Sequence, residues 1–156
     1  MPRRSGERRF CTTSALGQRR PEAVLSVPIR LLPGQDIRRA LEAALAERGL
    51  TAGFVIAGIG SLSRTPLRMA GRPDPTELTG DQELLTLSGS VSPVGSHLHA
   101  TVSNADGEVS GGHLAYGSVV RTTAEVLLAL LPEWSFSRAH DPGTGYDELK
   151  ISSVTR

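Results

Sequence analysis

The chain has 156 residues, 38% of them hydrophobic and 21% charged, which is typical of one soluble globular domain with a buried core. No apolar run approaches the roughly 20 residues that a membrane-spanning helix needs, and the single cysteine, Cys11, excludes an internal disulfide or a thiolate metal site. Six arginines and one glutamate give residues 1–20 a charge of +5, whereas eleven basic and fifteen acidic residues leave −4 elsewhere, which excludes a globally basic nucleic-acid-binding surface.

The first 21 residues are predicted to form a disordered, arginine-rich arm, and residues 22–156 a single domain. The motif "RRFC" is similar to part of a twin-arginine export signal, but no apolar stretch follows it, and an over-extended start of translation is the alternative. We therefore expect a cytoplasmic protein in a reducing compartment, without contact to a membrane. If DNA is bound, a local patch or this arm must bind it, through Arg3, Arg4, Arg8, Arg9, Arg19 and Arg20.

A strand followed by the main helix is predicted after the arm. Apolar residues alternate over 24–32 and stop at a Pro-Gly pair, which indicates a strand ended by a turn. Residues 36–48 carry apolar side chains at helical spacing, with Asp36 placed as an N-cap and Gly49 just past the end. This pattern predicts a helix.

The middle of the chain is predicted to be strand and loop. The stretch 53–63 is apolar, β-branched and interrupted by glycines, which predicts a buried strand with close backbone approach at Gly58 and Gly60. A short strand is expected within 65–71, and 71–81 is a loop by composition.

Three further segments complete the prediction. Alternation over 82–93 predicts a strand. Residues 121–132 are ambiguous, because alanine, leucine and glutamate favour a helix whereas the segment length and Pro132 also suit a buried strand. The pattern over 134–151 predicts a strand, a Gly-Pro turn and a second strand.

Three of the four histidines lie in two short predicted strands, "SHLHATVS" and "GEVSGGHLAYG", which the turn signal "NADG" joins into a hairpin. Because side chains alternate along a strand, His97 and His99 point to one side and the apolar residues around them point to the core. The hairpin brings His113 beside or opposite His99, depending on whether the turn contains a bulge. The three imidazoles can therefore converge outside the core.

Such a trio suits a metal ion. A His-x-His pair with a third histidine from the partner strand can hold tetrahedral Zn²⁺ at about 2.0–2.1 Å per nitrogen, with the fourth position open. Imidazole also binds copper, nickel or iron, so another divalent transition metal is the alternative to zinc. The other interpretations are a polar pocket lined by histidines, or three unrelated histidines. His140 follows no spacing that links it to the trio and is expected at the surface.

Several motifs together carry a resemblance to a known family. They are "HLHA", the turn that ends in Gly107, "GGHL" and a late pattern made of Arg138, Asp141, Thr144, Gly145, Glu148 and Leu149. From about Val24 to Ile151 the chain resembles the PPC domain, the plant and prokaryote conserved domain. The resemblance implies an α/β (α+β) fold in which an antiparallel sheet has one main flanking helix, assembly as a trimer, and a strand at 121–132.

The resemblance also implies a function. Prokaryotic stand-alone members look like metal carriers through histidines at the positions of His97, His99 and His113, whereas plant members lack these histidines and are fused to DNA-binding AT-hooks. This chain keeps the histidines and lacks the Arg-Gly-Arg-Pro core of an AT-hook. The resemblance therefore gives DNA binding little support and places the chain on the prokaryotic side.

Three functional hypotheses follow. The first is a non-enzymatic, trimeric, zinc-binding module with a DNA-binding or regulatory role. The second is a metal-dependent hydrolase or lyase acting on a small ligand, with Glu125, Asp141 or Glu148 as general acid or base and Arg138 holding an anionic substrate. For these four residues an ion pair or a set that fixes a turn is the alternative. The third is a structural assembly in which metal or water fills a pocket between subunits.

Overall fold

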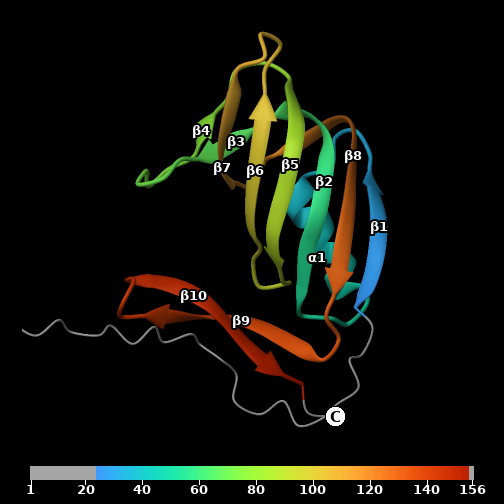
Figure 1. Cartoon of the computed structure of the whole chain (residues 1–156), viewed down its shortest axis with the longest axis vertical. Coiled ribbons are helices and arrows are strands. Elements are labelled where there is room, and N and C mark those ends of the chain that lie inside the picture. The colour runs from blue at the N-terminus through green and yellow to red at the C-terminus, as the bar shows by residue number, and fades with distance from the viewer. Residues whose placement is uncertain (1–23, 155–156) are drawn as a thin grey trace, which may run out of the picture.

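The computed structural model describes residues 24–154, which form one large antiparallel sheet, a single helix and a separate hairpin (Figure 1). The predicted arginine-rich arm lies outside the described residues. In the eight-stranded sheet the strand order is β1-β8-β2-β5-β6-β7-β3-β4, and the hairpin consists of β9 and β10. The elements are β1 (Leu25–Leu31), α1 (Ile37–Ala46), β2 (Gly53–Arg64), β3 (Pro66–Arg68), β4 (Thr76–Glu77), β5 (Gln82–Val91), β6 (His97–Ser103), β7 (Val109–Leu114), β8 (Val119–Leu130), β9 (Trp134–Asp141) and β10 (Tyr146–Ser153).

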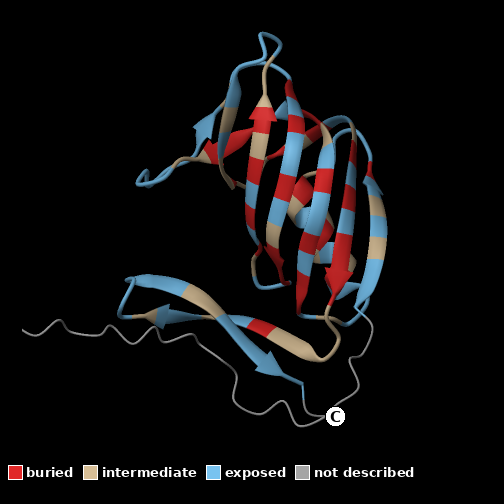
Figure 2. Ribbon diagram, in the orientation of Figure 1, coloured by how far each residue is buried: buried red, intermediate tan, exposed pale blue. Residues whose placement is uncertain are grey.

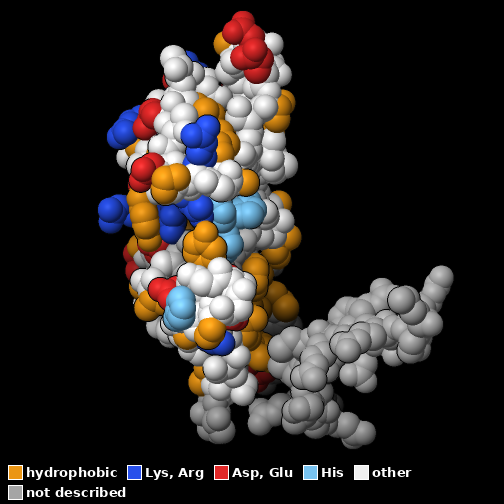
Figure 3. Space-filling model, turned by 90° about the vertical axis from the view of Figure 1, so that its left-hand side faces the viewer, with side chains coloured by type: hydrophobic (Ala, Val, Ile, Leu, Met, Phe, Trp, Pro, Cys, Tyr) orange, Lys and Arg blue, Asp and Glu red, His pale blue; other side chains and the backbone are white. Residues whose placement is uncertain are grey.

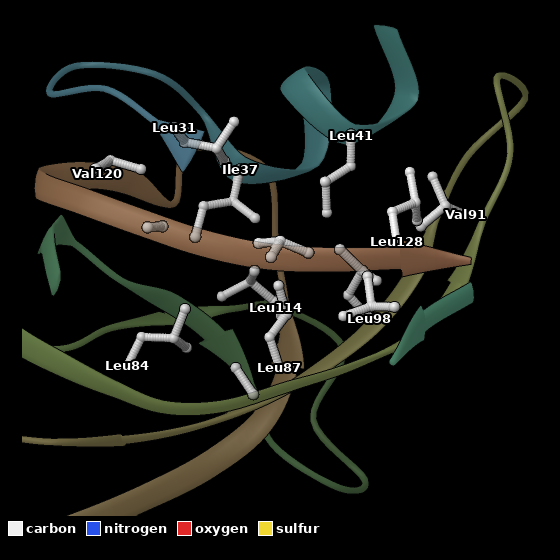
Figure 4. Packing of buried hydrophobic residues seen from close by; sticks show 14 of the residues in the cluster. Leu31, Ile37, Leu41, Leu84, Leu87, Val91, Leu98, Leu114, Val120 and Leu128 are labelled. Atoms are coloured by element: carbon white, nitrogen blue, oxygen red, sulfur yellow. The ribbon is translucent and has the colours of Figure 1, made fainter. Parts of the chain in front are cut away.

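Helix α1 lies within the predicted helical segment and covers one face of the sheet, as the family resemblance implies. The Asp36 side chain accepts a hydrogen bond from the backbone N–H of Arg39 at 3.1 Å and so caps the first turn. Ile37, Leu41 and Leu45, spaced four residues apart, are each 0% exposed. Figure 4 shows Ile37 and Leu41 pointing from the helix into the cluster of leucines and valines on the strands. The side of the sheet that faces α1 is therefore the core.

The ambiguous segment at 121–132 belongs to β8. It pairs with β1 on one side and with β2 on the other, so both edges of its backbone are hydrogen-bonded. Ala124, Val126 and Leu128 face the core, while alternate residues between them point outward. Pairing on both sides outweighs the helix propensity of its alanines and leucines.

The other strands follow the prediction with one correction. The loop expected over 71–81 contains the two-residue strand β4, which pairs with β3. Close approach at two glycines of β2 is confirmed. A Cβ on Gly58 would lie 2.8 Å from the Cβ of Leu87, and a Cβ on Gly60 would lie 2.5 Å from the carbonyl oxygen of Thr123.

The two faces of the sheet differ in what they pack against. Figure 2 shows buried and exposed residues alternating along the strands. On the face away from α1, several large apolar side chains are exposed, namely Ile56, Ile59, Leu85 and Leu127, which we call the outer apolar patch. No helix among residues 24–154 is long and apolar enough to cross a membrane.

The hairpin β9–β10 is the predicted strand, turn and strand, and it lies apart from the main sheet (Figure 1). The ring of Phe136 on β9 packs edge to face against the ring of Phe54 on β2, with the ring centroids 5.5 Å apart. The Thr51 hydroxyl also donates a hydrogen bond to the Ser135 hydroxyl at 3.2 Å. These contacts hold the start of the hairpin against the outer face of the sheet.

Candidate metal centre

The three predicted histidines meet on the outer face of the sheet. His97 and His99 lie on β6 and His113 lies on β7, where the strand register pairs His113 directly with His99. Of the two arrangements that the sequence allowed, the opposed pair is therefore observed. Leu98, between the two β6 histidines, is 1% exposed in the core, which confirms the predicted faces.

The ring nitrogens converge closely. Nε2 of His97 lies 3.1 Å from Nε2 of His99 and 3.1 Å from Nδ1 of His113. One donor atom from each ring can be chosen so that all three lie within 4.8 Å of one another. Two nitrogens bound to one tetrahedral Zn²⁺ lie about 3.3 Å apart, because each is about 2.0–2.1 Å from the ion. The donor set therefore fits a transition-metal ion.

Hydrogen bonds between the rings do not by themselves account for these short distances. Nε2 of a neutral His97 has either one proton or one lone pair, so it cannot make a well-directed hydrogen bond to both neighbouring nitrogens. Loss of hydration lowers the pKa of His113 to about 4, with the charge of Arg68 as the next cause. Loss of hydration, followed by the charges of His99 and Arg138, also lowers the pKa of His97. Both rings are therefore neutral near pH 7, with lone pairs free for a metal.

Helix α1 fixes the ends of the two strands that carry the trio. The Arg38 guanidinium donates to the carbonyl oxygen of Ser96 at 2.5 Å and to that of Leu114 at 3.2 Å. Ser96 precedes His97 and Leu114 follows His113, so one side chain holds both strands at the site.

A carboxylate one helical turn further along α1 completes this support. Oε1 of Glu42 accepts hydrogen bonds from the backbone N–H of Ser96 and from the Tyr116 hydroxyl, each at 2.9 Å. The Arg38 guanidinium lies over the Tyr116 ring, 3.9 Å from its centre. We call Arg38 and Glu42 the helix clamp.

A hollow of about 830 Å³ opens beside the trio. His97 and His113 line it together with Arg68 from β3, and with Arg138 and Glu148 from the hairpin. Its remaining lining includes Arg38, Tyr116, Tyr146 and Asp147. In Figure 3 basic side chains adjoin the pale-blue histidine patch. The site is therefore a basic pocket at the edge of the three imidazoles.

Two of the four predicted acid-base and anion-binding residues meet at the hollow, and the other two do not. Arg138 and Glu148 line the hollow, but Glu125 lies on β8 and lines a different depression, and Asp141 lies at the hairpin turn. There the Asp141 side chain accepts from the Gly143 backbone N–H at 2.8 Å, which is the turn-fixing role. His140 is exposed, 3.9 Å from an Asp147 carboxylate oxygen.

Sequence reasoning missed Arg38, Arg68 and Glu42. Arg68 reaches the site because β3 pairs with β7, where it lies opposite His113. The strand prediction at 65–71 carried no signal for that pairing. Arg38 and Glu42 share one helix side at i and i+4, which is the only sequence signal that linked them.

Comparison with known proteins identifies relatives of this chain. A sequence model of the Plants and Prokaryotes Conserved (PCC) domain matches residues 18–132. The bifunctional protein GlmU of Synechococcus sp. (strain JA-2-3B'a(2-13)) is 47% identical over 134 residues, which cover 86% of this chain and 21% of that protein. The chain thus spans about a fifth of the length of the curated relatives it matches, including a second Synechococcus GlmU at 48% identity.

Solved structures share the fold. A hypothetical protein from Salmonella cholerae-suis (Salmonella enterica) superposes with a TM-score of 0.78 at 40% identity, covering 85% of this chain and 97% of that one. A metal-containing protein from Archaeoglobus fulgidus has a TM-score of 0.69 at 29% identity, covering 81% and 94%. A protein from Bacteroides thetaiotaomicron, described as a candidate DNA-binding protein, has a TM-score of 0.70 at 24% identity, covering 80% and 91%, and shows the fold alone.

Proposed function

The chain belongs to the Plants and Prokaryotes Conserved domain family, and from that premise we propose that it is a trimeric metal-binding module whose ion sits on His97, His99 and His113. The observation that carries the proposal is the convergence of three ring nitrogens on the outer face of the sheet. A metal-containing structural relative at 29% identity supports it.

Zinc is the ion we propose. Three neutral imidazoles with an open fourth position are a known zinc ligand set, and copper, nickel and iron are the competing ions. Bound zinc would supply Lewis acidity at that open position. The helix clamp would hold the ligating strands in place, as the groups around metal ligands commonly do.

Metal analysis tests this proposal directly. We expect the full-length chain, purified without nickel-affinity resin, to carry one ion per set of three histidines by inductively coupled plasma mass spectrometry. His97→Ala/His99→Ala removes two of the ligands, so the variant should lose the ion. His140→Ala is the matched control, because that ring is exposed and separate from the trio. A double variant that retains as much metal as the native chain would overturn the proposal.

The trimer is proposed from the family and from the outer apolar patch. Ile56, Ile59, Leu85 and Leu127 expose apolar surface on three adjacent strands, which is the kind of surface that oligomers cover. Sedimentation velocity should give about three times the 16.5 kDa chain mass. Leu127→Glu should reduce it to the mass of one chain, because a charge would be buried between subunits. Val109→Glu, on an exposed residue of β7 outside the patch, should not. A native chain that sediments as a monomer would refute the trimer.

The geometry supports two other expected roles, DNA binding or regulation and hydrolase or lyase activity, less well. A DNA-binding or regulatory role would depend on the arm, whose arginines lie outside the described residues. A hydrolase or lyase would need an acid or base at the trio, and of the three predicted acids Glu148 alone lines the hollow. Metal binding is therefore the function that the described residues support best.

A further inference from the structure

Two guanidinium groups beside the trio have no carboxylate partner. Arg68 on β3 and Arg138 on β9 both line the hollow, and neither forms a salt bridge with any residue of 24–154. The one hydrogen bond recorded for either guanidinium runs from Arg138 to the carbonyl oxygen of Asp147, at 3.2 Å. Both groups therefore have donors left for a ligand.

Two other strand arginines, by contrast, do have carboxylate partners. Arg64 on β2 pairs with Glu77 at 3.0 Å, and Arg121 on β8 pairs with Asp81 at 2.8 Å. Arg38 lines the hollow too, but its two terminal nitrogens already donate to the carbonyls of Ser96 and Leu114. Arg38 therefore belongs to the helix clamp, and the guanidiniums available to a ligand are those of Arg68 and Arg138.

The charge of the hollow favours an anion. Its acidic groups are Glu148, whose carboxylate accepts from the Thr144 hydroxyl at 2.9 Å, and Asp147, whose side chain is 73% exposed. Three arginines against two acids leave an excess positive charge, and a divalent ion on the histidines would add to it. A volume of about 830 Å³ is ample for a small molecule.

We propose that this hollow binds a small oxyanionic ligand, a carboxylate or a phosphate, held by Arg68 and Arg138 next to the three histidines. The planar fork of donors on a guanidinium matches the oxygens of both groups. The two arginines come from different elements that line the hollow, β3 and the hairpin, so a ligand held by both would bridge the sheet and β9. The proposal deepens the proposed function and rests on it for the added charge of the metal.

Calorimetric titration tests the site in the full-length protein, both zinc-loaded and zinc-free. The probes are malonate for a carboxylate, inorganic phosphate for a phosphate, and glycerol as an uncharged control. We expect saturable binding of at least one anion, tighter with zinc present, and none of glycerol. Arg68→Gln and Arg138→Gln should each weaken that binding about tenfold or more, since each removes a charge-assisted hydrogen bond.

Two controls separate this proposal from the metal site. Arg48→Gln removes the same charge from an exposed residue just past α1 that does not line the hollow, and it should leave anion affinity unchanged within about twofold, as expected for a solvent-screened charge. Zinc content should be the same in all three arginine variants. If the protein takes up no zinc, the proposed function fails, yet the zinc-free titrations still decide the anion site. Anion binding that never saturates, or that both arginine variants keep at native strength, would overturn it.

Discussion

Helix α1 and the hairpin β9–β10 both contribute side chains beside His97 and His113, but the two elements are attached to the sheet in different ways. The helix inserts three fully buried apolar side chains into the core from the inner face. The hairpin pairs with itself and touches the outer face through Phe136 on Phe54 and Ser135 on Thr51. The helix is thus part of the hydrophobic core, whereas the hairpin is a peripheral element attached to the sheet.

This difference assigns the two elements different tasks. From the helix, Arg38 and Glu42 contact the backbone at the strand ends, and so determine where the histidines lie. From the hairpin, Arg138 and Glu148 face the hollow, and so determine what the site can contact. Metal affinity should therefore depend on α1, and ligand affinity on the hairpin together with Arg68 of β3.

A change in helix α1 should have the largest effect, and it should act on zinc affinity. Arg38→Met removes both hydrogen bonds to the strand ends and keeps most of the side-chain volume. Because groups that position metal ligands typically contribute 10–100-fold in metal affinity, we expect zinc affinity to fall by about that factor. Competition with a chromophoric chelator measures it.

A neighbouring arginine provides the control for that variant. Arg39→Met makes the same change one residue along α1, where the side chain is 75% exposed. The Arg39 guanidinium lies 4.0 Å from Asp36 and 5.2 Å from the centre of the Tyr116 ring, and it donates no hydrogen bond to the backbone of Ser96 or Leu114. The zinc affinity of this variant should match that of the native chain. Both variants should be compared at equal thermal midpoint, because a loss of zinc that merely follows global unfolding would contradict a positioning role for Arg38.

The fold and the trio were predictable where the information is local. Alternation of Leu98 with His97 and His99 sets the faces of β6, and one short turn carries the chain back to His113. The turn residue Gly107 has φ 80°, as its place in "NADG" requires. The three histidines lie on adjacent strands joined by one turn, β6 and β7, so their convergence needs no long-range information.

The missed parts all depend on long-range pairing. The helix clamp joins Arg38 to carbonyls 58 and 76 residues away, and Arg68 reaches His113 through the β3–β7 pairing. Because the sequence pattern does not reveal long-range pairing, two acids predicted for the site lie elsewhere. Glu125 and Asp141 have the chemistry of a general acid or base, but the pairing of β8 and the hairpin turn direct them away from the hollow.

The smallest effect is expected from loosening the hairpin. Phe136→Ala removes the edge-to-face contact with Phe54, and an aromatic pair of this kind contributes about 0.5–1.5 kcal/mol beyond its buried area. Undocking moves Arg138 away from the hollow, so anion affinity should fall by up to about tenfold, the equivalent of 1.4 kcal/mol. Zinc affinity should stay within about twofold, because no contact of the helix clamp involves the hairpin. Hydrogen exchange should quicken in β9 and β10 and remain unchanged in β6 and β7.

The residue directly opposite in the hairpin serves as its control. Ile151 pairs with Phe136 across β9 and β10 and is 54% exposed, so Ile151→Ala removes apolar surface from the hairpin without removing the ring contact. It should weaken anion binding less than Phe136→Ala does. If Phe136→Ala instead released zinc as readily as Arg38→Met, the hairpin would belong to the same rigid unit as the helix. The division between holding the metal and contacting the ligand would then be wrong.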